Sequence, residues 1–362
     1  MRPAGLALLV GVIACGAPAP RAIAQGPAPA PRVYVTNQES ATVSVLDART
    51  GELLTTIDLQ ALGFSATAKP HDAAVEPDGS FWYVTLIGDG RVLKFDRDNR
   101  LVGQVATPVP GLLSVAAEGD LMVAGRSMAA VNPPTSFAVI RRSDMTLLDQ
   151  VDVLFPRPHA IILSPDGRFV YTASLAENRI AAVDLERETV ELLDVPGPIH
   201  TVVEFALSPD GRWLTGTAQL TGNLFVWDLT DRARPALAQT VAVGRSPWHP
   251  SFTRNGCELY VPNLDDNTVS VIETRGWTVT HVIRDDRLAQ PHGSTVAPDG
   301  RVFISNRNQA GDAHDHSGHP DAGLGRVVVI DPVTHTVVSA VATGRYAAGT
   351  GSAAVASGPS CR

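Results

Sequence analysis

Short apolar, β-forming runs alternate with polar turns along the whole chain, and no stretch shows the period of a long amphipathic helix. Pro-Asp-Gly or Asn-Gly turns recur at intervals of roughly 40 to 50 residues. Each is followed by a predicted strand: Phe81–Leu86, Phe169–Ala173, Trp213–Thr217, Leu259–Asn263 and Val302–Asn306. A unit of this length holds four antiparallel strands and buries its faces only against its neighbours. The pattern therefore predicts an all-β propeller.

The number of blades follows from where the units begin. Six complete units start near residues 71, 111, 159, 202, 250 and 293. Residues 33–59 supply second, third and outer strands without an inner one, and residues 347–356 supply an inner strand alone. Pairing the two ends completes one more blade and leaves no open sheet edge. We predict a seven-bladed β-propeller with four-stranded blades over residues 32–358, its last blade closed by N- and C-terminal strands, and a tail at 359–362.

One four-residue run indicates the type of repeat. Tyr34-Val35-Thr36-Asn37 carries the signature of the YVTN family of β-propeller repeats, and related runs occur at 82–85 and 303–306. The mature chain resembles that family throughout, which implies the fold but no particular activity, because this repeat serves unrelated functions. The third unit is the least regular, with an inner strand expected at Leu112–Ala117 and an insertion over 128–135.

The N-terminus has the features of an export signal. Residues 1–24 combine a positive start, an apolar stretch and Ala22-Ile23-Ala24 as a cleavage site, and a Pro/Ala-rich linker follows at 25–31. A bacterial lipobox ending at Cys15 is the alternative, which would anchor the protein to a membrane. Both predict an exported protein, either periplasmic or secreted, or a lipoprotein held through Cys15. The net charge of −8 gives no basic footprint for nucleic acid.

Two further cysteines remain after export. Cys257 follows a turn, and Cys361 trails the last predicted inner strand. An oxidising compartment permits a disulfide between them, on the face opposite the histidines described next.

Five of the ten histidines recur at nearly the same place in successive units: His71, His159, His200, His249 and His292. Counted from the following turn, His249 is one residue and His200 three residues out of register with the others. In a propeller this position links one blade to the next inner strand, at the mouth of the central channel. We expect these imidazoles to meet there, and clustered imidazoles are typical transition-metal ligands. A lone histidine bonded to a carbonyl is the structural alternative for each.

A histidine-rich insertion at residues 307–323 is expected on the same face. His314, His316 and His319 could bind an ion, complete the site or close over a substrate. A solvated polar loop is the alternative. His281 and His335 fall on predicted outer strands and are expected at the surface.

The donor types favour copper, with iron or zinc next, because calcium and magnesium prefer carboxylates and only Asp72 and Glu204 lie near the predicted cluster. The runs Pro198-Ile199-His200-Thr201 and Pro70-His71-Asp72 resemble histidine-bearing stretches in the propeller of nitrous oxide reductase. That resemblance implies a copper site lined by histidines.

Two functions remain open from the sequence. The first is a copper-binding protein, with a metal-dependent oxidoreductase as its enzymatic form, whose partner is a small molecule or a metal donor at the histidine-bearing face. The second is a non-enzymatic scaffold that holds a protein or a cell-wall partner. A lactonase would need a channel carboxylate, for which Asp72 is the best candidate, and Arg126, Arg157 and Arg345 could hold an anion near the mouth.

Overall fold

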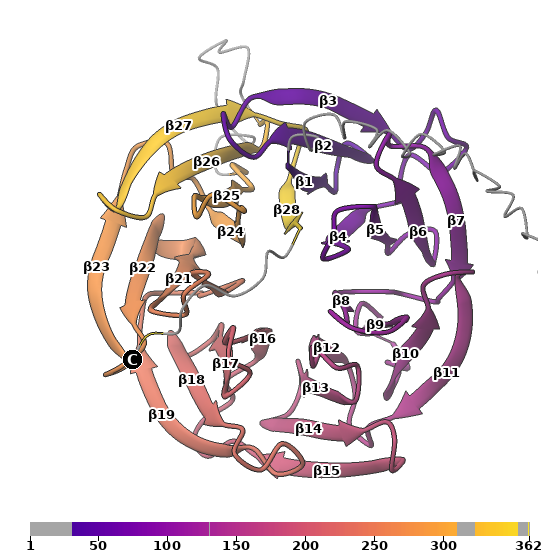
Figure 1. Ribbon diagram of the computed structural model, residues 1–362, viewed down its shortest axis with the longest axis vertical. Coiled ribbons are helices and arrows are strands. Elements are labelled where there is room, and N and C mark those ends of the chain that lie inside the picture. The colour runs from indigo at the N-terminus through magenta and orange to yellow at the C-terminus, as the bar shows by residue number, and fades with distance from the viewer. Residues whose placement is uncertain (1–30, 130, 310–322, 354–360, 362) are drawn as a thin grey trace, which may run out of the picture.

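Seven antiparallel sheets, each of four strands, are arranged as the blades of a ring in the computed structural model (Figure 1). The structure describes residues 31–129, 131–309, 323–353 and 361. The predicted signal segment, Cys15 and nearly all of the linker lie outside the described residues, as do His314, His316 and His319. The all-β class, the blade number and the four-stranded blades are confirmed.

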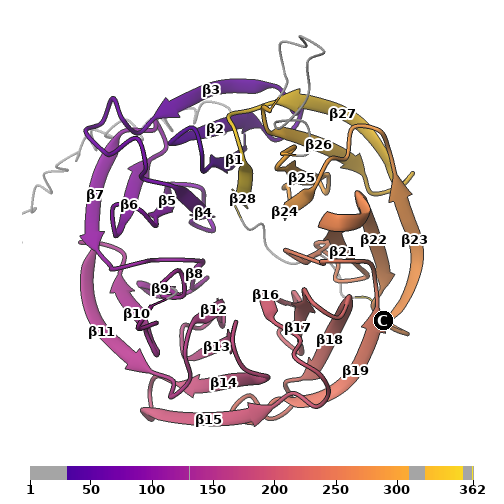
Figure 2. The ribbon, with the colours of Figure 1, turned by 180° about the vertical axis from the view of Figure 1, so that it is seen from behind.

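The ring is closed by one blade built from both ends of the chain. The inner strand β28 (Ala347–Ser352) pairs with β1 (Arg32–Asn37), and β2 (Thr42–Asp47) and β3 (Leu53–Asp58) complete this seam blade. Figure 2, seen from behind, shows β28 beside β1 at the inner side of the ring. The predicted closure is therefore confirmed.

The other six blades each follow in chain order, from the inner to the outer strand. The second to fourth blades are β4 (Pro70–Val75), β5 (Phe81–Leu86), β6 (Arg91–Asp96) and β7 (Leu101–Ala106); β8 (Leu113–Val115), β9 (Leu121–Ala124), β10 (Ser136–Arg141) and β11 (Thr146–Asp152); β12 (Pro158–Leu163), β13 (Phe169–Ser174), β14 (Arg179–Asp184) and β15 (Thr189–Asp194). The fifth to seventh are β16 (Val202–Leu207), β17 (Trp213–Ala218), β18 (Asn223–Asp228) and β19 (Ala236–Ala242); β20 (Ser251–Phe252), β21 (Glu258–Asn263), β22 (Thr268–Glu273) and β23 (Thr278–Arg284); β24 (Pro291–Val296), β25 (Val302–Asn306), β26 (Arg326–Asp331) and β27 (Thr336–Ala342). A 3-10 helix, η1 (Leu264–Asp266), joins β21 to β22.

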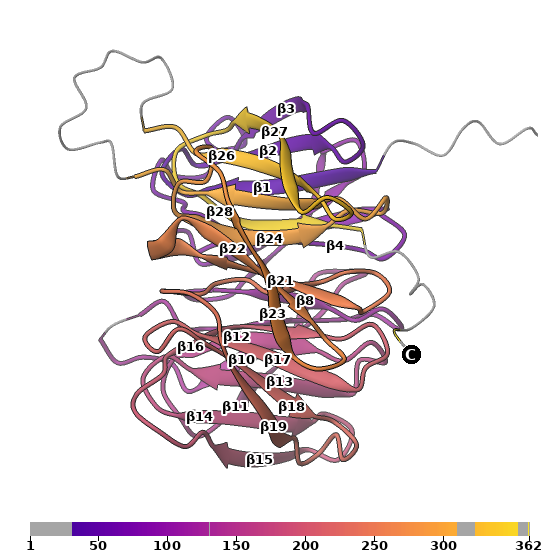
Figure 3. The same ribbon diagram turned by 90° about the vertical axis from the view of Figure 1, so that its left-hand side faces the viewer.

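The core lies between blades, because the second and third strands of each blade are buried on both faces whereas the outer strands are largely exposed. Tyr34 of the seam blade stacks on Trp82 of the second blade with ring centroids 4.5 Å apart, and Trp82 stacks on Phe95 at 4.2 Å. Figure 3 shows the ring edge-on, with neighbouring blades packed side by side. Each blade thus covers its neighbour's apolar face, as the repeat requires.

Each residue of the Tyr34–Asn37 run has a structural role. Tyr34 and Val35 are buried core residues. The Thr36 hydroxyl donates to the carbonyl of His71 in the next blade at 3.0 Å. The Asn37 amide donates to Thr42 and Ser44 across the hairpin, at 3.0 Å each. These four residues therefore provide core packing, a hydrogen bond to the next blade and hydrogen bonds across the hairpin.

Two details differ from the sequence prediction or refine it. The inner strand of the third blade covers only Leu113–Val115. It ends as β4 does, with the Ala116 N–H bonded to the Leu121 carbonyl, but it begins three residues after Pro110, whereas β4 begins at the proline itself. Cys257 is joined to Cys361 by a disulfide with Cα atoms 5.0 Å apart. Cys257 lies beyond the turn that follows β20, at the end of that blade away from His249. Among the described residues, no helix is long and apolar enough to cross a membrane.

Candidate functional site

Every blade has a non-glycine residue in the left-handed backbone conformation at an equivalent point of the link that leads into its inner strand; the link before β12 has a second one, Leu154. The φ angles lie between 48 and 57° at Lys69, Val109, Arg157, Thr201, Ser246, Gln290 and Tyr346. Residues other than glycine rarely adopt this conformation, and such positions concentrate where function fixes the backbone. The repetition in all seven blades turns the chain at the same point of each link.

The left-handed residues define a common register for the residues that follow. We name the second residue after each one the first mouth position, and the third residue the second mouth position. The first mouth position holds His71, Gly111, His159, Val203, Trp248, His292 and Ala348. The second mouth position holds Asp72, Leu112, Ala160, Glu204, His249, Gly293 and Gly349. Three histidines are therefore equivalent, and the fourth, one residue along as the sequence indicated, shares its position with the two carboxylates.

Strand irregularities begin at these positions. The register between inner and second strand shifts at His159, at His71 with Asp72, and at His292 with Gly293. Bulges of this kind redirect side chains next to functional sites. Consecutive residues of one strand can thus contribute to the same cluster.

The structure brings four of the predicted histidines together from four different blades. The rings of His71 and His159 have centroids 5.9 Å apart, and those of His249 and His292 are 5.1 Å apart. His249 Nε2 lies 3.0 Å from a carboxylate oxygen of Glu204. All five of these side chains are buried. We name His71, Asp72, His159, Glu204, His249 and His292 the mouth cluster.

Neighbouring blades hold these rings in place. Besides the Thr36 bond to the His71 backbone, the Gln38 amide donates to Nδ1 of His71. Nε2 of His71 has no partner within the described residues. His159 donates from Nδ1 to the Val203 carbonyl at 2.8 Å, which leaves its Nε2 as the unprotonated nitrogen of the neutral ring. His159 therefore presents an unprotonated nitrogen to a ligand, whereas neutral His71, which accepts at Nδ1, carries its proton on Nε2 and would have to change tautomer to bind a metal ion there.

His292 is the most deeply buried member of the cluster, with no exposed surface. Trp248 packs on it with ring centroids 4.3 Å apart. Neither ring nitrogen has a hydrogen-bond partner within the described residues, although the Ala348 carbonyl lies close enough to act on the pKa of the ring. A buried imidazole without partners is costly, and such a group calls for an explanation by function or by an unseen ligand.

Burial keeps three of the rings neutral. It lowers the pKa of His71 and of His292 well below the usual value and that of His159 to about 4, and the nearby positive charges of His249 and Arg307 add to the effect. Neutral imidazole is the form that binds a metal ion.

The carboxylates give the other half of the cluster the opposite character. Burial raises the pKa of Asp72 to about 7; the charge of Glu204 adds to this, whereas that of His249 opposes it. Burial also acts to lower the pKa of His249, but Glu204 and Asp72 outweigh it, and the pKa is raised overall. Asp72 accepts a hydrogen bond from the Leu113 N–H at 2.8 Å. The mouth cluster thus combines neutral imidazoles with a carboxyl group that exchanges its proton near neutral pH.

His200 is not brought into this group. It precedes the left-handed Thr201, whereas the other four follow their link residues. Its Nδ1 bonds to Thr221 at 2.9 Å and its Nε2 to the Pro196 carbonyl at 3.0 Å, and its ring packs on Phe225. Both nitrogens are therefore occupied, as expected of a structural histidine.

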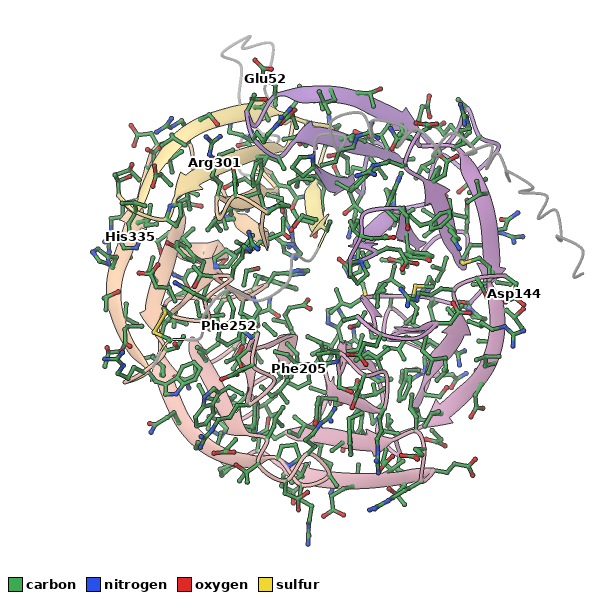
Figure 4. The ribbon with its side chains drawn as sticks, in the orientation of Figure 1. Glu52, Asp144, Phe205, Phe252, Arg301 and His335 are labelled. Atoms are coloured by element: carbon green, nitrogen blue, oxygen red, sulfur yellow. A yellow bond between two sulfur atoms is a disulfide. The ribbon has the colours of Figure 1, made fainter. Side chains whose placement is uncertain are left out.

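The other predicted residues lie as follows. His281 is exposed. His335 lies at the outer rim (Figure 4), where it is half-buried and 3.0 Å from Glu258. Arg126 donates to Ser136 and Gln150, Arg157 donates to the Ser127 carbonyl, and Arg345 pairs with Glu39. These arginines are therefore engaged by the protein.

The sequence analysis missed Arg307, whose guanidinium lies at the mouth cluster beside two aromatic rings.

Geometry limits what the cluster does without rearrangement. In the part of the chain that the structure describes, no three His, Cys, Asp or Glu side chains are grouped closely enough to hold a metal ion. The rings meet in pairs, and a shared ion would require them to turn toward one another.

Comparisons with known proteins bear on the fold. No protein-family model matches the chain, and no curated protein matches it in sequence. The solved structures that share the fold include the following three. A protein of unknown function from Desulfotomaculum acetoxidans is 15% identical, with a TM-score of 0.68 over 88% of this chain and 98% of its own. The periplasmic gluconolactonase of Pseudomonas aeruginosa is 19% identical, with a TM-score of 0.69 over 89% of this chain and 98% of its own. The hydrazine synthase of Kuenenia stuttgartiensis is 19% identical, with a TM-score of 0.62 over 77% of this chain and 88% of its own. At these identities the likeness shows a shared propeller fold.

Proposed function

We propose that the protein is an exported propeller of the YVTN type that binds a transition metal ion in the mouth cluster. The observation that carries the proposal is the convergence of four buried imidazoles from four blades, two of which have ring nitrogens without partners in the described residues. A neutral imidazole binds a metal ion through its unprotonated nitrogen, which His159 presents at Nε2. The Cys257–Cys361 disulfide supports an oxidising compartment, and therefore export.

Copper is the first candidate because imidazole donors predominate. Zinc or iron follows, since Asp72 and Glu204 in the same cluster supply the carboxylate that these ions accept beside histidine. The bound ion would polarise a small molecule or would itself cycle between redox states. The ring of blades would fix the positions of the protein ligands. The His249–Glu204 contact would orient one ligand from behind.

Metal titration of the chelator-treated protein tests the proposal. We expect one transition metal ion to bind near stoichiometrically, measured by calorimetry and elemental analysis. We expect the metal affinity to fall at least tenfold in the double variant His71→Ala/His292→Ala, since replacing even a group that only hydrogen-bonds to a metal ligand typically costs that much. His200→Asn is the matched control and should bind metal like the parent, because its ring is engaged elsewhere. A parent protein that ignores copper, zinc and iron would refute the proposal.

A second candidate is hydrolysis of a lactone, and the specific observation that favours it is Asp72. A general base works best when its pKa is near the operating pH, and burial gives Asp72 a pKa of about 7 beside the mouth. The gluconolactonase named above has the same fold. Glucono-δ-lactone is the substrate to test: turnover lost in Asp72→Asn supports this function, and no turnover above buffer eliminates it for that substrate.

A further inference from the structure

The guanidinium of Arg307 is bracketed by aromatic rings from both neighbouring blades. It lies 4.9 Å from the ring centroid of Trp248 in the sixth blade and 4.6 Å from that of Tyr346 in the seam blade. Arg307 itself follows directly after β25 of the seventh blade. Trp248 is at the first mouth position, and Tyr346 is the left-handed residue of its link. The bracket therefore belongs to the same mouth as the histidines.

A repeated backbone bond shows why the side chain lies there. In six blades the residue just after the second strand donates its N–H to the carbonyl of the left-handed residue: Gln38, Ile87, Leu175, Gln219, Leu264 and Arg307. Gln38, at this position, reaches Nδ1 of His71. Arg307 is the charged member of this set. Its charge acts to lower the pKa of all four mouth-cluster histidines, although the carboxylates outweigh it at His249.

Arg307 has no counter-ion among the described residues. Its Nε is buried without a hydrogen-bond partner, and no described carboxylate lies within ion-pair distance of it. The residue as a whole is half-buried, and Asp265 is the described carboxylate whose charge acts on its pKa from a longer distance. Aromatic stacking occupies the faces of a guanidinium and leaves the N–H donors along its edge, which match an oxyanion in two parallel bonds.

We propose that Arg307 binds the oxyanion of a small-molecule ligand, a carboxylate or a phosphate group, beside the mouth cluster. The inference deepens the proposed function, because the anion would sit next to the metal. Arg307 itself repels a metal cation, so its place at the cluster is explained by an anion and not by metal ligation. The rings of Trp248 and Tyr346 hold the Arg307 guanidinium in one orientation, which favours anions that approach from the channel mouth.

The test uses the metal-free full-length protein and trifluoroacetate, followed by fluorine NMR at constant ionic strength. We expect binding to the parent protein and at least tenfold weaker binding to Arg307→Gln. Tyr346→Leu and Arg307→Lys should bind trifluoroacetate with intermediate affinity. The first variant loses one of the two aromatic rings beside the guanidinium, and the second replaces the planar guanidinium with an ammonium group. Arg301→Gln is the matched control and should bind like the parent, because Arg301 precedes β25 whereas Arg307 follows it. Equal affinity in Arg307→Gln and the parent, or no binding by the parent, overturns the proposal.

Two further arms separate the possibilities. Displacement of trifluoroacetate by inorganic phosphate extends the ligand class to phosphorylated compounds, and failure to displace it restricts the class to carboxylates. Copper titration of Arg307→Gln should show affinity equal to or higher than that of the parent, because a repelling charge is gone. A protein that binds anions through Arg307 but binds no metal would refute the metal site and leave this inference standing.

Discussion

Replacing Asp72 with asparagine should stabilise the metal-free protein at pH 8. The carboxyl is buried and its pKa is raised to about 7, from a usual value near 4. Between these two values the folded state holds the proton more firmly than the unfolded state does, so stability falls as pH rises through that window. A difference of about three pKa units corresponds to roughly 4 kcal/mol. The penalty is absent below about pH 4 and complete above about pH 7.

The amide keeps an oxygen to accept the Leu113 N–H, but its NH₂ group needs a partner of its own. A buried amide left partly unsatisfied costs roughly 1–3 kcal/mol. We therefore expect a net gain of about 1–3 kcal/mol at pH 8 for Asp72→Asn. Near pH 4 the gain should vanish or change sign.

Urea unfolding of parent and variant at several pH values from 4 to 8, after dialysis against a chelator, measures this difference. The variant's advantage should grow by about 4 kcal/mol across the range. Asp149→Asn, at an exposed site, is the matched control and should show no such trend. A stability difference between Asp72→Asn and the parent that does not change with pH would refute the reasoning.

Three more changes test how the ring supports the mouth. Glu76→Gln should cost about 3 kcal/mol in urea unfolding, because the buried Arg142 loses its carboxylate partner. Gly349→Ala should lower both the thermal midpoint and metal affinity, because the new Cβ would lie 2.5 Å from the His71 carbonyl oxygen. Reducing the Cys257–Cys361 disulfide, whose partners are 104 residues apart, should lower the unfolding free energy by about 4 kcal/mol and leave metal affinity unchanged.

The fold was predictable because each of its signals is local and repeated. Alternating strands and Asp-Gly turns mark every blade, and the Tyr34–Asn37 run combines core, inter-blade and hairpin contacts in one short segment. The seam was predictable because the chain begins with three strands of a blade and ends with one. The short inner strand of the third blade was not predicted, because its length depends on where pairing begins after Pro110, which the repeat pattern does not mark.

The mouth was predictable only in part, because its register depends on backbone conformation. Five of the left-handed residues precede a proline, which made His71, His159, His249 and His292 recognisable. His200 follows Pro198, but the left-handed residue of that blade is Thr201. The proline therefore did not indicate the residue at which this link turns toward the mouth. Arg307 was missed because it belongs to a separate register. Aligning the residues that follow each second strand would have found it as the charged position among mostly apolar or amide side chains.

The distribution of unfavourable features in the molecule supports a function at this mouth. Stacked aromatics such as Tyr34 on Trp82 stabilise the ring between its blades, away from the channel. The mouth, in contrast, concentrates left-handed non-glycine residues, a carboxyl group with a raised pKa, imidazole nitrogens without partners and an arginine without a counter-ion among the described residues. Each of these features lowers the stability of the fold, and natural proteins accept such losses mainly where a site requires them. Because the features differ in kind and come from separate blades, a single ligand set that includes a metal ion and an anion accounts for them together. Packing alone explains none of them.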